Sequence, residues 1–138
     1  MNISDEYRKV IIDDFRFASK MMQSVTYAEQ KLFHFSATFG TLLRVFNMQY
    51  DPQLVFAYLV FNSAYATINA RIAAIKTGDP TIEIPEDFFP KLAMTINDFA
   101  DKIDRKMDTF EILQRVAELS YISTGNGFYL FQKGLLKL

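Results

Sequence analysis

The chain has 138 residues, half of them hydrophobic and 22% charged, which excludes a disordered chain and supplies enough apolar material for one domain, residues 1–138. Its 15 Lys and Arg residues nearly balance 16 Asp and Glu residues without a basic block, so the sequence carries no electrostatic footprint for nucleic acid. Because Cys is absent, disulfide frameworks and thiolate metal sites are excluded as well.

The first predicted helix runs from about Ser4 to about Gln23. Ser4 is a typical N-cap, because its side-chain oxygen can accept a hydrogen bond from a backbone N–H of the first turn. At about 100° per residue, the apolar side chains of this segment cover one broad arc of the helix. Asp14 lies near the centre of that arc. A carboxylate in such surroundings needs a partner or must be protonated, so Asp14 is a candidate site residue.

The second predicted helix begins after Thr26 and ends near Asn47. Its apolar residues recur at spacings of 4-3-4-3-4, which is typical of an antiparallel bundle. These residues are Ala28, Leu32, Phe35, Phe39, Leu42 and Phe46. The pattern predicts that one narrow face of this helix packs against its neighbours in the chain.

The stretch from Asp51 to Gly78 predicts the helix around which the others are arranged. Asp51 supplies an N-cap, Pro52 suits the first helical position, and Gly78 ends the helix. One face carries Leu54, Tyr58, Phe61, Tyr65, Ile68, Ile72 and Ile75. The other faces carry Val55, Phe56, Ala57, Leu59, Val60, Ala64, Ala66, Ala70, Ala73 and Ala74. Because this helix is apolar nearly all round, we expect it in the middle of the bundle, with neighbours on several sides.

The remaining chain is predicted to form two further helices and a terminal segment. Residues 78–85 form a crossing loop, the fourth helix begins near Pro85 or Glu86, and the fifth begins near Asp108. A Gly-rich break is predicted at residues 123–127. Five helical segments with short connections predict an all-α fold, an up-and-down antiparallel helical bundle of four long helices plus a short C-terminal helix.

A polar layer inside this bundle is the candidate site. If the first three helices have equal stagger, Asp14, Asn62 and His34 lie at nearly the same level. A small ligand or a proton could then bind between the helices. Two other interpretations are a structural layer that sets helix register and an Asp14 that reaches solvent or a subunit interface. The same stagger puts Arg44 nearer a bundle end, so Arg44 is not expected as the partner of Asp14.

The sequence predicts no metal, cofactor or catalytic residue. Di-iron bundles need two Glu-x-x-His pairs, but the single histidine, His34, has Lys31 at that spacing. A Gly-x-Ser-x-Gly nucleophile elbow is absent. The turn at residues 125–127 lacks the Lys and the Ser or Thr of a phosphate-binding loop.

Residues 128–138 are predicted to be amphipathic. The apolar face, a candidate association surface, carries Phe128, Phe131, Leu135 and Leu138. This segment could be an intramolecular lid, a dimerisation arm or an interfacial membrane helix. Only two lysines lie on its polar face, which disfavours membrane contact.

The leading functional hypothesis is a self-associating, non-enzymatic interaction or structural module that forms a homodimer. The reason is that the chain has more hydrophobic residues than one small bundle needs for its core. The alternative is a binder of a small apolar ligand, or an enzyme, with its site near Asp14, Asn62 and His34. A polar N-terminus argues against a signal peptide, and Arg71 interrupts the most apolar window. A cytoplasmic location is therefore expected.

Overall fold

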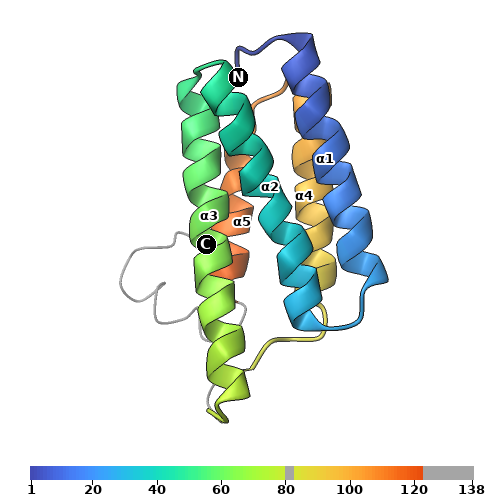
Figure 1. Ribbon diagram of the computed structural model, residues 1–138, viewed down its shortest axis with the longest axis vertical. Helices are drawn as coiled ribbons and strands as arrows, with labels where there is room; N and C mark the ends of the chain where they lie inside the picture. The colour runs from blue at the N-terminus through green and yellow to red at the C-terminus, as the bar shows by residue number, and fades with distance from the viewer. Residues whose placement is uncertain (80–82, 123–138) are drawn as a thin grey trace.

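The computed structural model describes residues 1–79 and 83–122, and this part of the chain forms five α-helices that alternate in direction (Figure 1). The helices are α1 (Asp5–Ser24), α2 (Ala28–Met48), α3 (Pro52–Lys76), α4 (Phe88–Asp104) and α5 (Phe110–Ile122). The predicted all-α bundle is thus confirmed. The fourth helix begins slightly later than predicted, at Phe88.

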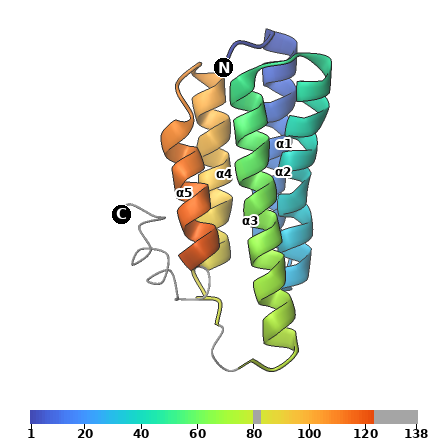
Figure 2. The same cartoon turned by 90° about the vertical axis from the view of Figure 1, so that its left-hand side faces the viewer.

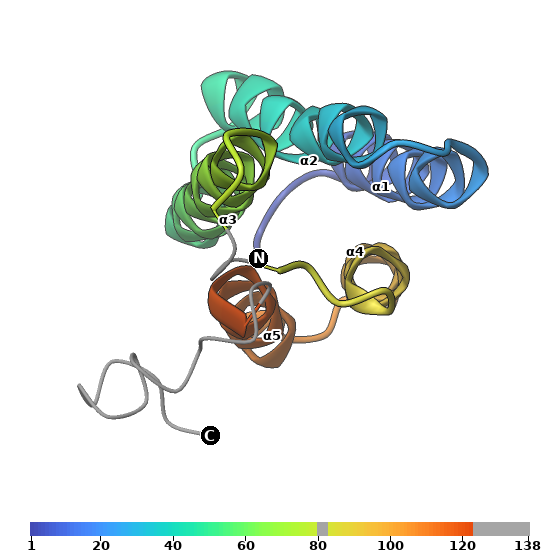
Figure 3. The ribbon, with the colours of Figure 1, turned by 90° about the horizontal axis from the view of Figure 1, so that it is seen from below.

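The helices form a ring around a shared core rather than surrounding a central helix (Figure 3). Going round the ring, α1 packs on α2 and α4, α3 packs on α2 and α5, and α4 packs on α5. Neighbouring helices are antiparallel except α3 and α5, which lie side by side in the same direction (Figure 2). The C-terminal part of α3 projects beyond the ends of the other helices.

The prediction that the helix after Asp51 lies in the middle of the bundle is wrong. Its cap is as expected, because Asp51 accepts a hydrogen bond from the backbone N–H of Gln53 and Pro52 is the first helical residue. The helix itself is one member of the ring, between α2 and α5, and its outward face is exposed. Alanines make up much of that face, and small apolar side chains are common on protein surfaces.

The centre of the core is a cluster of four phenylalanines, one from each of α1 to α4. All four are fully buried: Phe15, Phe35, Phe61 and Phe99. Phe61 contacts the other three rings, with centroids 5.3 Å from Phe15, 5.4 Å from Phe99 and 5.8 Å from Phe35. Phe15 also stacks on Phe99 at 4.8 Å. Edge-to-face and offset-stacked rings attract one another beyond the effect of their burial, so this cluster joins four helices at one level.

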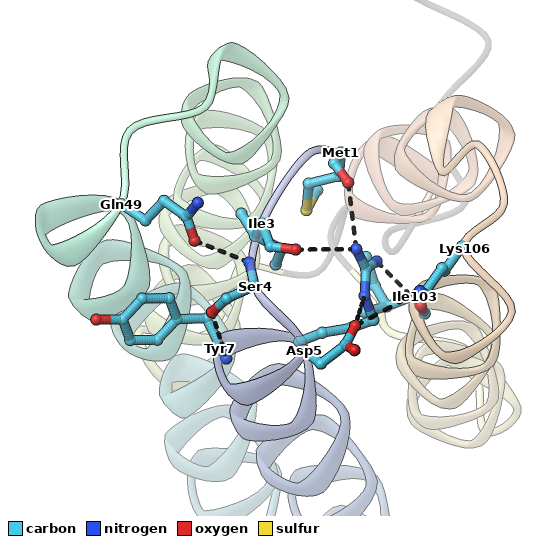
Figure 4. Close-up of polar contacts among 9 residues, drawn as sticks. Met1, Ile3, Ser4, Asp5, Tyr7, Gln49, Ile103 and Lys106 are labelled. Carbon is cyan, nitrogen blue, oxygen red and sulfur yellow. Dashed lines mark hydrogen bonds and ion pairs between the residues drawn. The ribbon is translucent and has the colours of Figure 1, made fainter.

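Arg8 connects the N-terminal segment to the end of α4 through contacts with Met1, Ile3 and Ile103, which are labelled in Figure 4. Its guanidinium donates hydrogen bonds to the carbonyls of Ile103 at 3.3 Å, Ile3 at 3.2 Å and Met1 at 3.5 Å. The carbonyls in the last turn of a helix have no partner within the helix, so the contact with Ile103 caps α4. Asp5 lies 3.8 Å from Arg8 Nε and 3.5 Å from Lys106 Nζ, and therefore holds two cations at this end.

The same end of the bundle is closed by Ser4 and Asp51. The Ser4 hydroxyl accepts from the Tyr7 N–H at 3.3 Å, which confirms the predicted N-cap of α1, and the Ser4 N–H donates to the Gln49 side chain at 2.9 Å (Figure 4). Asp51 is buried, and its second carboxylate oxygen accepts from the Asn2 N–H at 2.9 Å. Residues of the N-terminal segment are thereby attached to the α2–α3 connection.

Candidate functional site

Asp14 pairs with α2 at the surface of the bundle. One carboxylate oxygen accepts a hydrogen bond from the Thr41 hydroxyl at 2.8 Å and another from the Arg44 guanidinium at 3.2 Å. The side chains of Asp14 and Arg44 are 42% and 67% exposed. The carboxylate therefore has both a cation and access to water, which is the arrangement of an ordinary surface ion pair.

The expectation that Arg44 is not the partner of Asp14 is wrong. The contact with Thr41 shows that Asp14 is level with the later turns of α2. His34 is seven residues before Thr41, or roughly 10 Å lower along the helix at ~1.5 Å per residue. The long Arg44 side chain then spans the remaining turn.

The structure does not bring the three predicted site residues together by hydrogen bonds. Within residues 1–79 and 83–122, the Asp14 carboxylate is bonded to Thr41 and Arg44, not to Asn62 or His34. Asn62 is half-buried on α3, which packs mainly on α2 and α5. His34 is also half-buried and has its ring edge-on to Phe33, with centroids 5.5 Å apart. A role for these residues in ligand binding stays a prediction.

Thr41→Val should lower the free energy of unfolding by about 1 kcal/mol, because the buried hydroxyl is lost as a donor to Asp14 and as an acceptor from Arg44. Asp14→Asn keeps a side-chain oxygen for Thr41 and should cost less. Urea denaturation of both variants measures the difference. A larger loss for Asp14→Asn would contradict the assignment of this pair as a weak surface contact.

A groove opens at the lower end of the bundle, between the start of α2, the end of α3 and residues 83–86, with a volume of about 510 Å³. Its apolar lining comes from Ala28, Ile72, Ile75, Ile84, Pro85 and Phe89. Both lysines at the groove are engaged: Lys76 forms an ion pair with Glu29 at 2.7 Å, and Lys31 donates to the carbonyls of Met22 and Val25. An apolar body fits this lining better than an anionic head group does.

The contribution of the Lys76–Glu29 ion pair to the stability of the folded protein depends on pH. The hydrogen bond from Lys76 holds the pKa of Glu29 below its ordinary value of 4.5. A carboxyl with a lowered pKa stabilises the folded state at neutral pH, and this contribution is lost as the pH falls below 4.5 through the lowered value. Both side chains are exposed, so the effect is small.

We therefore expect wild type to have a slightly higher urea midpoint than Lys76→Met at pH 7, and a smaller difference at pH 3, because more of Glu29 is protonated at the lower pH. Urea unfolding of both proteins at the two pH values makes the comparison. A difference of equal size at pH 3 would show that Lys76 acts through its aliphatic stem instead.

One face of α3 is exposed and carries no charged side chain. We call it the outer face of α3 and define it by six exposed residues at spacings of 3-4-3-4-3: Phe56, Leu59, Ser63, Ala66, Ala70 and Ala73. No exposed residue of α3 from position 52 to position 75 is charged. Phe56 and Leu59 are 47% and 54% exposed, and the ring of Phe110 on α5 stacks on Phe56 at 6.4 Å, which extends the apolar surface.

Exposed apolar side chains also occur on α1 and α2, where Phe17 and Phe33 are exposed. Unlike the outer face of α3, these two helices also expose charged side chains, such as Arg16, Lys20, Glu29 and Arg44. The outer face of α3 is not among the sites predicted from the sequence, because Phe56 and Leu59 were expected on a helix with neighbours on several sides. The signal was present, since the 3-4 spacing of these residues forms a second stripe on the side opposite Leu54 and Phe61.

Three further features were considered in the sequence: an association surface near the C-terminus, a metal site and a membrane-spanning helix. The association surface proposed at Phe128, Phe131, Leu135 and Leu138 lies outside them. Between residues 1 and 122, leaving out 80–82, there is no group of three or more His, Asp or Glu side chains placed to hold a metal ion. A search of the same residues for a helix with the length and apolar character needed to cross a membrane finds none.

Comparison with protein-family models, curated proteins and solved structures finds no match to this chain. Its function is therefore inferred from its surfaces.

Proposed function

We propose that this protein is a non-enzymatic interaction module that forms a homodimer through the outer face of α3. The observation that supports the proposal is the run of exposed, uncharged side chains along α3, with Phe56 and Leu59 among them. Contiguous exposed apolar surface of this kind marks interaction sites, because burying it against a partner releases about 25 cal/mol per Å². In contrast, Asp14 and its partners form a solvated ion pair.

Leu59→Glu is the direct test. It places a carboxylate in the middle of the apolar surface, and burying a charge without a partner is costly, so the dimer should dissociate. Met94→Glu is the matched control, because Met94 is an exposed apolar residue on α4, across the ring from α3. Sedimentation velocity at micromolar to millimolar concentrations should show a dimer for wild type and Met94→Glu, and a monomer for Leu59→Glu. A wild-type protein that stays monomeric at the highest concentration contradicts the proposal.

A second candidate function, binding of a small apolar ligand, is favoured by the groove at Ile75 and Ile84. A fluorescent apolar dye should bind wild type and lose affinity roughly tenfold for Ile75→Asp, since a carboxylate would enter an apolar lining. The outcome against this function is dye binding that Ile75→Asp leaves unchanged.

A further inference from the structure

The outer face of α3 has a large half and a small half. Phe56 and Leu59 occupy the N-terminal half, whereas Ala66, Ala70 and Ala73 occupy the C-terminal half. Ser63 lies between them. Read from Ser63 in the two directions, each large residue is matched by an alanine at about the same distance. The stripe is therefore complementary to its own reverse.

We infer that a second copy of this chain packs its α3 antiparallel against the first, with the twofold axis beside Ser63. In this register Phe56 lies opposite Ala70 of the second copy and Leu59 lies opposite Ala66. A large side chain therefore packs against a small one at each of these positions. A parallel pair would instead place Phe56 against Phe56 and Ala70 against Ala70, which gives crowding at one end and a gap at the other. The inference rests on the proposed dimer and adds its orientation.

Helix geometry agrees with this register. A 3-4 spacing keeps the six residues on one stripe for about 26 Å, from Phe56 to Ala73 at ~1.5 Å per residue. Alanine and serine let two helix axes approach to about 8 Å, the close end of the usual range. A twofold arrangement uses the same surface on both subunits, as most homodimers do. Antiparallel helices also bring ends of opposite partial charge together.

Self-complementarity is the reason for assigning this face to a second copy. An unrelated partner would place no requirement on how large and small residues are distributed about Ser63. The absence of charge fits as well, because a charged residue on a twofold interface faces its own kind or must find an opposite partner. From Pro52 to Ile75, no exposed residue of α3 is charged.

Single-cysteine variants test the register, because the natural chain has no Cys. Ser63→Cys should form a disulfide-linked dimer in high yield under mild oxidation, since its Cα lies within the ~7 Å limit of its symmetry mate. Phe56→Cys or Ala70→Cys alone should give little, because each lies roughly 21 Å along the axis from its own mate. An equal mixture of Phe56→Cys and Ala70→Cys should form the cross-linked heterodimer.

A volume exchange gives a second, independent readout. Ala70→Phe should weaken dimerisation at least tenfold, because two bulky rings then meet at one level. Adding Phe56→Ala to the same chain moves the large residue to the other half and should restore the dissociation constant to within threefold of wild type. Failure of the double variant to recover, with both variants folded by circular dichroism, overturns the register.

The possible outcomes separate this inference from the proposed dimer. Self-cross-linking of Phe56→Cys and Ala70→Cys, as well as Ser63→Cys, indicates a parallel dimer and overturns only the orientation. A dimer that neither cross-links at these positions nor responds to Leu59→Glu overturns both. If the Ser63→Cys variant is monomeric and its thiol reacts slowly with a thiol reagent at every dilution, the chain covers this face itself, and both proposals fail.

Discussion

Phe61→Ala is expected to lower the free energy of unfolding by about 3–5 kcal/mol, the largest loss of any single side chain that we predict. Phe61 is fully buried and contacts Phe15, Phe35 and Phe99, so its removal leaves a cavity lined by three rings on three different helices. Backbone packing between the helices limits how far these rings can move into the space, and the lost contacts are therefore not recovered.

Urea unfolding followed by far-UV circular dichroism measures this loss. Phe33→Ala is the control, because Phe33 is a phenylalanine within a helix but is 70% exposed, and its removal should change the free energy of unfolding by no more than about 0.5 kcal/mol. Similar losses for the two variants would mean that the phenylalanine cluster is not the centre of the core.

Asp51→Ala is expected to cost about 2–3 kcal/mol, because one small substitution removes two charge-assisted hydrogen bonds at a buried position. The Gln53 N–H in the first turn of α3 loses its cap. The Asn2 N–H loses the acceptor that attaches the N-terminal segment to the α2–α3 connection. Both donors then lose an ionised acceptor, which is a stronger hydrogen-bond partner than the water that replaces it.

Two variants make the Asp51 result interpretable. Asp51→Asn keeps one side-chain oxygen, so it should retain part of the stability. Asp87→Ala is the matched control, because Asp87 is the N-cap residue of α4 but makes no capping hydrogen bond, and its exposed ion pair with Lys91 contributes little. A loss for Asp87→Ala as large as that for Asp51→Ala would show that helix-end charge, rather than the bonds to Asn2 and Gln53, sets the effect. These measurements belong at low protein concentration, because dimerisation would add a concentration-dependent contribution to stability.

The candidate site shows how far the axial position of one helix relative to another can be predicted from the sequence. Asp14 stands out in the sequence because it interrupts an apolar arc, and it does have polar partners on α2. The identity of these partners was not predictable, because it depends on which turn of α2 lies beside Asp14. A shift of two turns moves a neighbour by roughly 11 Å, enough to replace His34 by Thr41, and Arg44 lies one turn further along α2.

By itself, the sequence determined the helical elements of this protein. Ser4 and Asp51 carry acceptors for unpaired N–H groups, and apolar residues recur with the helical period, so helix starts and the all-α bundle follow from local chemistry. Only the tertiary structure decided which apolar stripe of α3 is covered. Periodicity identifies a face that can pack, but the number of neighbours depends on how the whole ring closes. Here the stripe of Leu54 and Phe61 faces the core, while that of Phe56 and Leu59 faces outward.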